Sequence, residues 1–98
     1  MERKPKWADK KTDELFRAIL SLKTISECER FFRDLLTLNE IKEFSIRWQI
    51  ACLLDKNMSF RKIAEKTKTS TTTVGRVAYW LYHGQGGYRL VLDKLKKK

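Results

Sequence analysis

Residues 60–77, with the sequence FRKIAEKTKTSTTTVGRV, contain the most informative pattern of the chain. The spacing of the apolar residues in this stretch predicts two short helices joined by a polar turn, which is the arrangement of a helix-turn-helix. Four residues fit the inner faces of these helices: Ile63, Ala64, Val74 and Val77. The outer face of the second helix must be small or polar to enter a DNA major groove. The Ser and Thr run at residues 70–73 meets this need, and we predict the motif at about 59–78.

The turn between these helices departs from the usual pattern in one respect. A glycine is common there because it tolerates a positive φ angle, and in this chain the position falls on Lys68 or a neighbour. An ordinary helical hairpin within a bundle is the alternative interpretation. That alternative gives no reason for a run of Ser and Thr to stand beside concentrated basic charge.

Basic charge is concentrated in the half of the chain that contains this motif. The 98 residues include 22 Lys and Arg and 12 Asp and Glu, which gives a net charge of +10. Residues 1–49 carry 11 basic and 9 acidic side chains, whereas residues 50–98 carry 11 basic and 3 acidic ones. Such asymmetry favours a polyanion, here nucleic acid, as the partner. A solubilising face is the alternative, although such faces usually mix both signs.

Helical spacing of apolar residues continues through the rest of the chain, and no stretch alternates as a strand would. We therefore predict an all-α single domain over residues 1–98, with about six helices and mobile termini at 1–8 and 96–98. Four further helices are expected: one capped by Thr12, one opened by a capping box at Ser26–Glu29, one running from a second box at Thr37–Glu40 to about Lys56, and a last one at Tyr88–Leu95.

The third helix of the chain is apolar on nearly all sides. Between Phe44 and Leu54 its only polar residues are Ser45, Arg47 and Gln49. Such a helix must be covered on most sides, and a chain of 98 residues has few elements to cover it. A second subunit is the economical cover, which predicts an obligate homodimer. A monomeric bundle that buries the helix alone is the alternative.

Other classes of function find little support in the sequence. No apolar run approaches 18 residues, and the N-terminus lacks the apolar region of a secretory signal, so we expect a cytoplasmic protein without a membrane span. Cys28 and Cys52 lie in apolar-periodic segments and fit buried, reduced thiols better than a disulfide or a metal site. His83 is the only histidine and has no paired nucleophile, and Gly84–Gly87 lacks the Lys-Ser/Thr of a phosphate loop. We therefore predict no enzyme activity, no metal and no cofactor.

The residues from Arg30 to about Tyr82 resemble the Trp repressor superfamily. Nearly the whole chain is similar to the bacterial YerC/YecD branch of that superfamily, including the segments Trp7–Asp9, Phe31–Thr37 and His83–Tyr88. The resemblance implies an intertwined all-helical homodimer whose third helix crosses that of its mate. It also implies sequence-specific binding to double-stranded operator DNA, with one recognition helix of each subunit in successive major grooves.

The resemblance also implies which residues contact DNA. Arg61 matches an arginine of the first motif helix that reaches bases, and Thr71 and Thr72 match base-reading positions at the start of the recognition helix. Ser70 and Gly75 complete the set that we expect to face bases. Six neighbours are expected to hold phosphates: Lys56, Lys62, Lys66, Lys68, Thr73 and Arg76. Phosphate contacts position the protein, and base contacts specify the site.

A small-molecule pocket is a further implication of the resemblance. Arg47 and Arg76 fall where two arginines of the repressor sandwich tryptophan, and Thr37 falls where a threonine lines the same pocket. Trp80 stands at the position of a serine that holds the amino group of the ligand, and Val77 at that of a glycine that gives the ligand room. These two departures argue against tryptophan as a corepressor, because the Trp80 indole would fill the pocket. A buried, hydrogen-bonded Arg47 that orients the dimer core is the alternative interpretation of that residue.

Together these observations predict a dimeric helix-turn-helix protein that binds double-stranded DNA and represses transcription. Three alternatives stay open: a protein–protein interaction module that docks through the motif, an RNA-binding protein, and a repressor gated by a small molecule of unknown identity. Trp48, Trp80 and Tyr82 are candidates for a base-stacking platform, although aromatic residues at helical spacing more often belong to a core.

Overall fold

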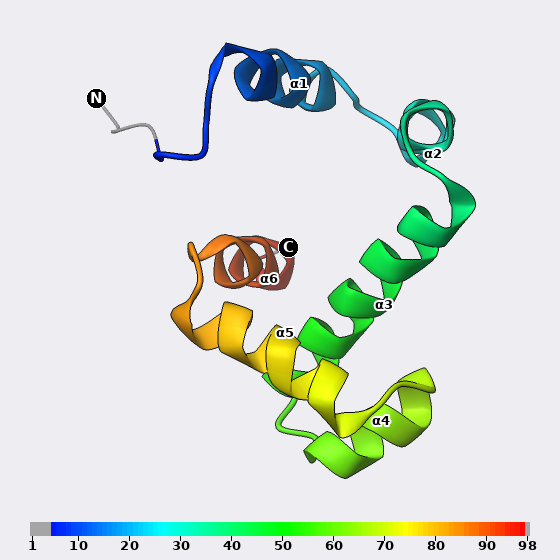
Figure 1. The fold of residues 1–98 in the computed structure, drawn as a ribbon, viewed down its shortest axis with the longest axis vertical. Coiled ribbons are helices and arrows are strands. Elements are labelled where there is room, and N and C mark those ends of the chain that lie inside the picture. Colours follow the sequence, from blue (N-terminus) through cyan, green and yellow to red (C-terminus); the bar gives the residue numbers. More distant parts are fainter. Residues whose placement is uncertain (1–4, 98) are drawn as a thin grey trace. The chain divides into compact units, whose positions relative to one another are not determined.

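The computed structural model describes residues 5–97, and within that range it contains six helices and no strand (Figure 1). The helices are α1 (Lys10–Leu20), α2 (Ile25–Leu35), α3 (Leu38–Asp55), α4 (Phe60–Thr67), α5 (Thr71–His83) and α6 (Gly87–Lys96). The predicted all-α fold of about six helices is confirmed. The chain divides into two compact units, one ending at Leu38 and the other beginning at Asn39.

The N-terminal unit contains α1 and α2, and both helices begin earlier than predicted. Asp9 caps α1 by accepting a hydrogen bond from the Thr12 N–H (2.9 Å), and the Thr12 hydroxyl accepts one from the Asp9 N–H (2.8 Å). The prediction of Thr12 as the cap was wrong, because Thr12 is the third helical residue of a reciprocal capping box. Thr24 caps α2 by accepting from the Glu27 N–H (3.1 Å), so the prediction of a box starting at Ser26 was also wrong. In each case the earlier cap keeps more of the chain helical, which the cooperativity of helix formation favours.

The side chains of α1 and α2 find little cover within their own unit. Neither helix contains a buried residue. Edge-on ring contacts join Trp7 to Phe16 and Phe31 to Phe32, with ring centroids 6.2 and 5.5 Å apart. Both helices are amphipathic, so their apolar faces remain available for further packing.

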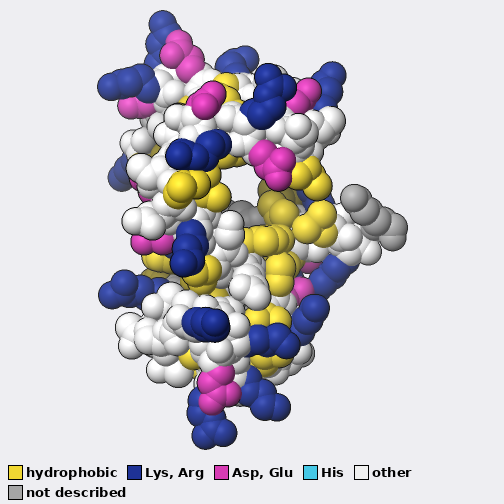
Figure 2. Space-filling view, turned by 90° about the vertical axis from the view of Figure 1, so that its right-hand side faces the viewer, with side chains coloured by type: hydrophobic (Ala, Val, Ile, Leu, Met, Phe, Trp, Pro, Cys, Tyr) yellow, Lys and Arg dark blue, Asp and Glu magenta, His cyan; other side chains and the backbone are white. Residues whose placement is uncertain are grey.

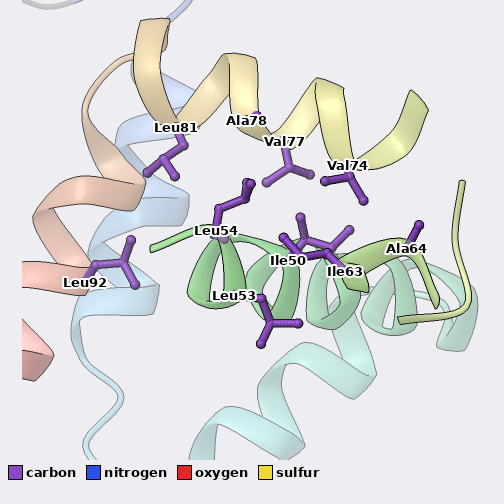
Figure 3. Packing of buried hydrophobic residues seen from close by; sticks show 11 residues of the cluster. Ile50, Leu53, Leu54, Ile63, Ala64, Val74, Val77, Ala78, Leu81 and Leu92 are labelled. Carbon is purple, nitrogen blue, oxygen red and sulfur yellow. The ribbon is translucent and has the colours of Figure 1, made fainter. Parts of the chain in front are cut away.

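The hydrophobic core lies in the C-terminal unit and draws on α3, α4, α5 and α6. Figure 3 shows the side chains of Ile50 from α3, Ile63 from α4, and Val74 and Val77 from α5 gathered against one another. The core consists of Ile50, Ala51, Leu53, Leu54, Ile63, Ala64, Val74, Val77, Ala78, Leu81 and Leu92. All four residues predicted for the inner faces of the motif belong to it, which confirms that prediction.

An ion-pair cluster fixes α6 to the end of α3. The Asp55 carboxylate lies 2.9 Å from the Arg89 guanidinium and 2.8 Å from the Lys96 ammonium. The hydrogen bonds from Lys96 and Arg89 lower the pKa of Asp55 from its ordinary value. The last helix thus includes Lys96, which the sequence predicts to lie in a mobile tail. Residues 1–4 and 98 of the predicted mobile termini lie outside the described residues.

Candidate nucleic-acid interface

α4 and α5 are the two helices of the motif, and hydroxyl side chains set where each begins. Ser59 caps α4 by accepting from the Lys62 N–H (3.2 Å), and Ser70 caps α5 by accepting from the Thr73 N–H (3.1 Å). Between the helices Lys68 adopts the left-handed conformation, with φ 59° and ψ 42°. This is the position at which the sequence predicts a glycine-like turn residue. The second helix continues beyond the predicted end of the motif.

The recognition helix α5 has a buried side and an exposed side. The core residues that it contributes are Val74, Val77, Ala78 and Leu81. Thr71, Thr72 and Arg76 are exposed. Ser70 is exposed as well, but its hydroxyl is engaged in the cap and lies 3.1 Å from the hydroxyl of Thr73. The first turn of α5 thus presents hydroxyl side chains to solvent while the opposite side anchors the helix in the core.

α4 and its flanks carry most of the positive charge of the motif. Arg61, predicted to reach bases, is exposed at the start of α4. Of the residues predicted to hold phosphates, Thr73 is half-buried and the others are exposed: Lys56, Lys62, Lys66, Lys68 and Arg76. Figure 2 shows basic side chains protruding at the lower end of the view, where α4 lies. Between residues 56 and 76 the only acidic residue is Glu65, so this part of the surface is strongly cationic.

Gly75, the remaining residue predicted to face bases, is partly covered by Phe60. Gly75 is half-buried, and a Cβ atom added to it would lie 3.9 Å from Cε2 of Phe60. The Phe60 residue is itself 44% exposed. The sequence reasoning placed Phe60 at the start of a helix but missed it as a surface residue. The available signal was an apolar ring directly between a helix cap and two basic residues.

Arg47 and Trp80, two of the residues predicted to line a ligand pocket, are brought together in the C-terminal unit. The guanidinium carbon of Arg47 lies 5.4 Å from the centroid of the Trp80 ring, within the range of a cation–π contact. Arg47 is exposed in the single chain, and its burial in a dimer core stays a prediction. Arg76 is exposed on α5. Thr37 is exposed in the N-terminal unit.

Trp80 lines an open groove of about 680 Å³ between the end of α5, α3 and α6. The groove walls are formed mainly by Trp48, Trp80, Tyr88 and Val91. Trp48 and Tyr88 stack with their ring centroids 6.2 Å apart and their planes 19° apart. Burial raises the pKa of Tyr88, and the nearby charge of Arg47 opposes that shift. The groove is therefore an aromatic surface with a cation close to it.

The two cysteines, Cys28 and Cys52, are free thiols. Burial raises the pKa of the Cys52 thiol, and the nearby charge of Lys56 opposes that shift. Within residues 5–97, no group of three or more His, Cys, Asp or Glu side chains is placed to hold a metal ion. No helix in the described part of the chain is long and apolar enough to cross a membrane.

The motif and the helices around it match a known family. A sequence model described as Trp repressor protein matches residues 10–96. The chain belongs to the Trp repressor family. An uncharacterised protein of Bacillus subtilis, YerC, is 42% identical over 88 residues, which cover 90% of this chain and 85% of that protein. These matches confirm the resemblance to the YerC/YecD branch of the Trp repressor superfamily.

Two solved structures share the fold of this Trp repressor family chain. A TrpR-like protein from Eubacterium eligens is 41% identical, with a TM-score of 0.86 over 90% of this chain and 91% of that one. A proposed Trp repressor from Staphylococcus aureus is 36% identical, with a TM-score of 0.87 over 95% of this chain and 93% of that one. The six-helix arrangement is therefore that of Trp repressor-like proteins.

Proposed function

We propose that this Trp repressor family protein is a homodimer that binds specific sequences of double-stranded DNA and represses transcription. One observation carries the proposal: α5 is anchored by a buried face while its first turn exposes hydroxyl side chains beside a basic α4. A helix held firmly on one side and polar on the other suits insertion into a major groove. Membership of the Trp repressor family supports the same function.

The proposed DNA contacts divide into two sets. Arg61, Thr71 and Thr72 face base edges, with Ser70 and Gly75 at their margin. Arginine commonly makes paired hydrogen bonds to guanine, whereas threonine hydroxyls contact several bases, so Arg61 contributes the sharper preference. The exposed lysines of α4 and its flanks, together with Thr73 and Arg76, hold phosphates and set the position of the protein on the duplex.

We propose that a second copy of the chain buries the apolar surface that is exposed in a single copy. Leu20 at the end of α1 and Ile25 at the start of α2 are 82% and 81% exposed. Phe44 of α3 is 49% exposed, although its helix is apolar on most sides. Exposed apolar side chains of this kind favour an interaction surface. We propose that residues 1–98 act as one domain within a cytoplasmic homodimer.

Selection of duplex DNA from a random pool by the purified protein tests this proposal. The expected result is an enriched site with two-fold symmetry. If each subunit neutralises three or four phosphates, the logarithm of the binding constant falls with the logarithm of salt concentration at a slope of about −5 to −7. Failure to enrich any site, with binding that vanishes as salt rises, would overturn the proposal in favour of a protein-docking surface. Preference for single strands over duplex would instead indicate RNA.

Arg61→Ala and Arg17→Ala form a matched pair for the base-reading role. Both arginines are exposed, one on α4 and the other on α1. Arg61→Ala is expected to lower affinity by about 1–3 kcal/mol for each half-site and to relax the preference at one base pair. Arg17→Ala is expected to leave the selected sequence unchanged. Equal effects of the two substitutions would show that Arg61 has no base-reading role.

A repressor gated by a small molecule is the second candidate function, and the groove beside Trp80 favours it. The aromatic walls and the Arg47 guanidinium suit a planar molecule with a negative charge. The same selection, repeated with and without tryptophan, tests this candidate. Enrichment that requires tryptophan would support gating, and Arg76→Ala is then expected to abolish the increase in duplex affinity that tryptophan causes. Identical enrichment in both conditions would exclude tryptophan as the effector.

A further inference from the structure

The proposed DNA surface contains one apolar element, the ring of Phe60. Phe60 is the first residue of α4, and its ring lies 3.9 Å from the point that a Cβ atom of Gly75 would occupy. The ring therefore lies next to the space into which a side chain of residue 75 would extend. Thr71 is one helical turn before Gly75 and lies on the same edge of α5. Phe60 thus contributes an apolar surface to the edge of α5 that we propose to face bases.

Packing between α4 and α5 leaves part of Phe60 exposed to solvent. Phe60 is 44% exposed, whereas Ile63, on the same helix, is completely buried. The exposed ring is followed directly by two exposed cations, Arg61 and Lys62. Charge of this sign favours a polyanion as the molecule that covers the ring. A duplex has one apolar group in its major groove, the C5 methyl of thymine.

We propose that Phe60, with Gly75 beside it, contacts a thymine methyl group and makes thymine the preferred base at one position of each half-site. This inference rests on the proposed DNA-binding function. Glycine at position 75 leaves the Phe60 ring accessible, because a long side chain at this position would cover the ring. An added Cβ atom would make only an ordinary van der Waals contact, so alanine fits at this position without moving Phe60.

Replacement of thymine by uracil in the selected duplex tests the contact, because uracil keeps the same base pairing and lacks only the methyl group. Each thymine of one half-site is replaced in turn, and affinity is measured by fluorescence anisotropy. Loss of one buried methyl group predicts about fourfold weaker binding at the contacted position. In Phe60→Ala, the ratio of the affinity for the thymine duplex to the affinity for the uracil duplex is expected to fall to about one at that position. In Phe16→Ala, which removes a ring on α1 that is also 44% exposed, this ratio of affinities is expected to stay at the wild-type value.

The outcomes separate this inference from the proposed function. If no duplex is selected, both fail. If a duplex is selected but no thymine methyl contributes, or if its contribution survives in Phe60→Ala, only the role of Phe60 is overturned. Should Phe60→Ala prove unfolded by circular dichroism, Gly75→Leu replaces it, because the longer side chain covers the ring without removing it. Gly75→Leu is expected to lose the same thymine preference. If Gly75→Leu keeps the wild-type ratio of affinities for the thymine and uracil duplexes, the inference is overturned.

Discussion

Replacing Lys68 by glycine separates the two roles that we assign to this turn residue. Lys68 has φ 59° and ψ 42°, and its N–H points at the carbonyls of Ala64 and Glu65 at the end of α4. The left-handed conformation costs a residue with a Cβ atom about 1–2 kcal/mol. Glycine is free of this strain but loses about 0.5–1 kcal/mol through its more flexible unfolded state. These two ranges leave a net gain of about 0–1.5 kcal/mol, and its midpoint of about 0.75 kcal/mol is expected to raise Tm by about 3–6 °C in a domain of this size.

The same substitution is expected to weaken DNA binding. Lys68 is exposed and belongs to the proposed phosphate contacts. Its loss removes one cation from each subunit of the proposed dimer. Each phosphate contact contributes about −0.9 to the slope of log affinity against log salt, so the slope becomes shallower by about 1.8. Anisotropy titrations over a series of salt concentrations measure the slope, and calorimetry at a fixed protein concentration measures Tm.

Asn57→Gly is the matched control for Lys68→Gly. Asn57 has a similar left-handed φ of 63° but carries no charge. Asparagine tolerates this conformation better than lysine, so the gain in Tm is expected to be smaller and the salt slope unchanged. A Tm of Lys68→Gly at or below the wild-type value would refute the strain argument. A wild-type salt slope would refute the phosphate contact, and an equal slope change in Asn57→Gly would trace the effect to the turn backbone instead of the charge.

Two further substitutions test packing and charge in the C-terminal unit. Gly84→Ala is expected to lower Tm, because the added Cβ atom would collide with the backbone oxygen of Trp80, and a wild-type Tm in calorimetry would contradict this. Asp55→Asn removes the ion pairs to Arg89 and Lys96, whose hydrogen bonds lower the pKa of Asp55. A carboxylate with a lowered pKa stabilises the folded state above the unfolded pKa, so this stability is lost as pH falls below about 4. Urea titrations between about pH 3 and pH 6 should show that loss in the wild type and a smaller one in Asp55→Asn, whereas parallel profiles would refute the linkage.

The helix-turn-helix was predictable because short-range patterns determine it. The inner-face residues recur at helical spacing, and two serines, Ser59 and Ser70, precede the apolar runs that they cap. The unusual backbone conformation of Lys68 also follows from local constraints, since a turn this tight between two helices requires a left-handed residue. Each of these features involves residues within one or two helical turns of one another.

The ends of the outer helices were less predictable, for two physical reasons. Several polar residues compete for each cap, and Thr12 and Ser26 look as suitable from the sequence as Asp9 and Thr24, which cap the helices. The position at which α6 ends depends instead on a residue distant in the sequence, since Lys96 pairs with Asp55 on α3. A local pattern contains no information about such a pair.

The candidate site also contains some features that the sequence predicts and others that it does not. Exposure of the first turn of α5 follows from its buried opposite face, and the sequence predicts both. The contact of Phe60 with Gly75 and that of Arg47 with Trp80 depend on how two helices cross.

Within α5, the demands of the core and of the proposed DNA contact fall on different residues. Val74 and Val77 are 0% and 1% exposed, so their truncation would remove packing and destabilise the fold. Thr72 and Arg76 are exposed, and substitutions at such positions usually change stability by less than about 0.5 kcal/mol. The outer face can therefore change its base preference while the inner face keeps the fold.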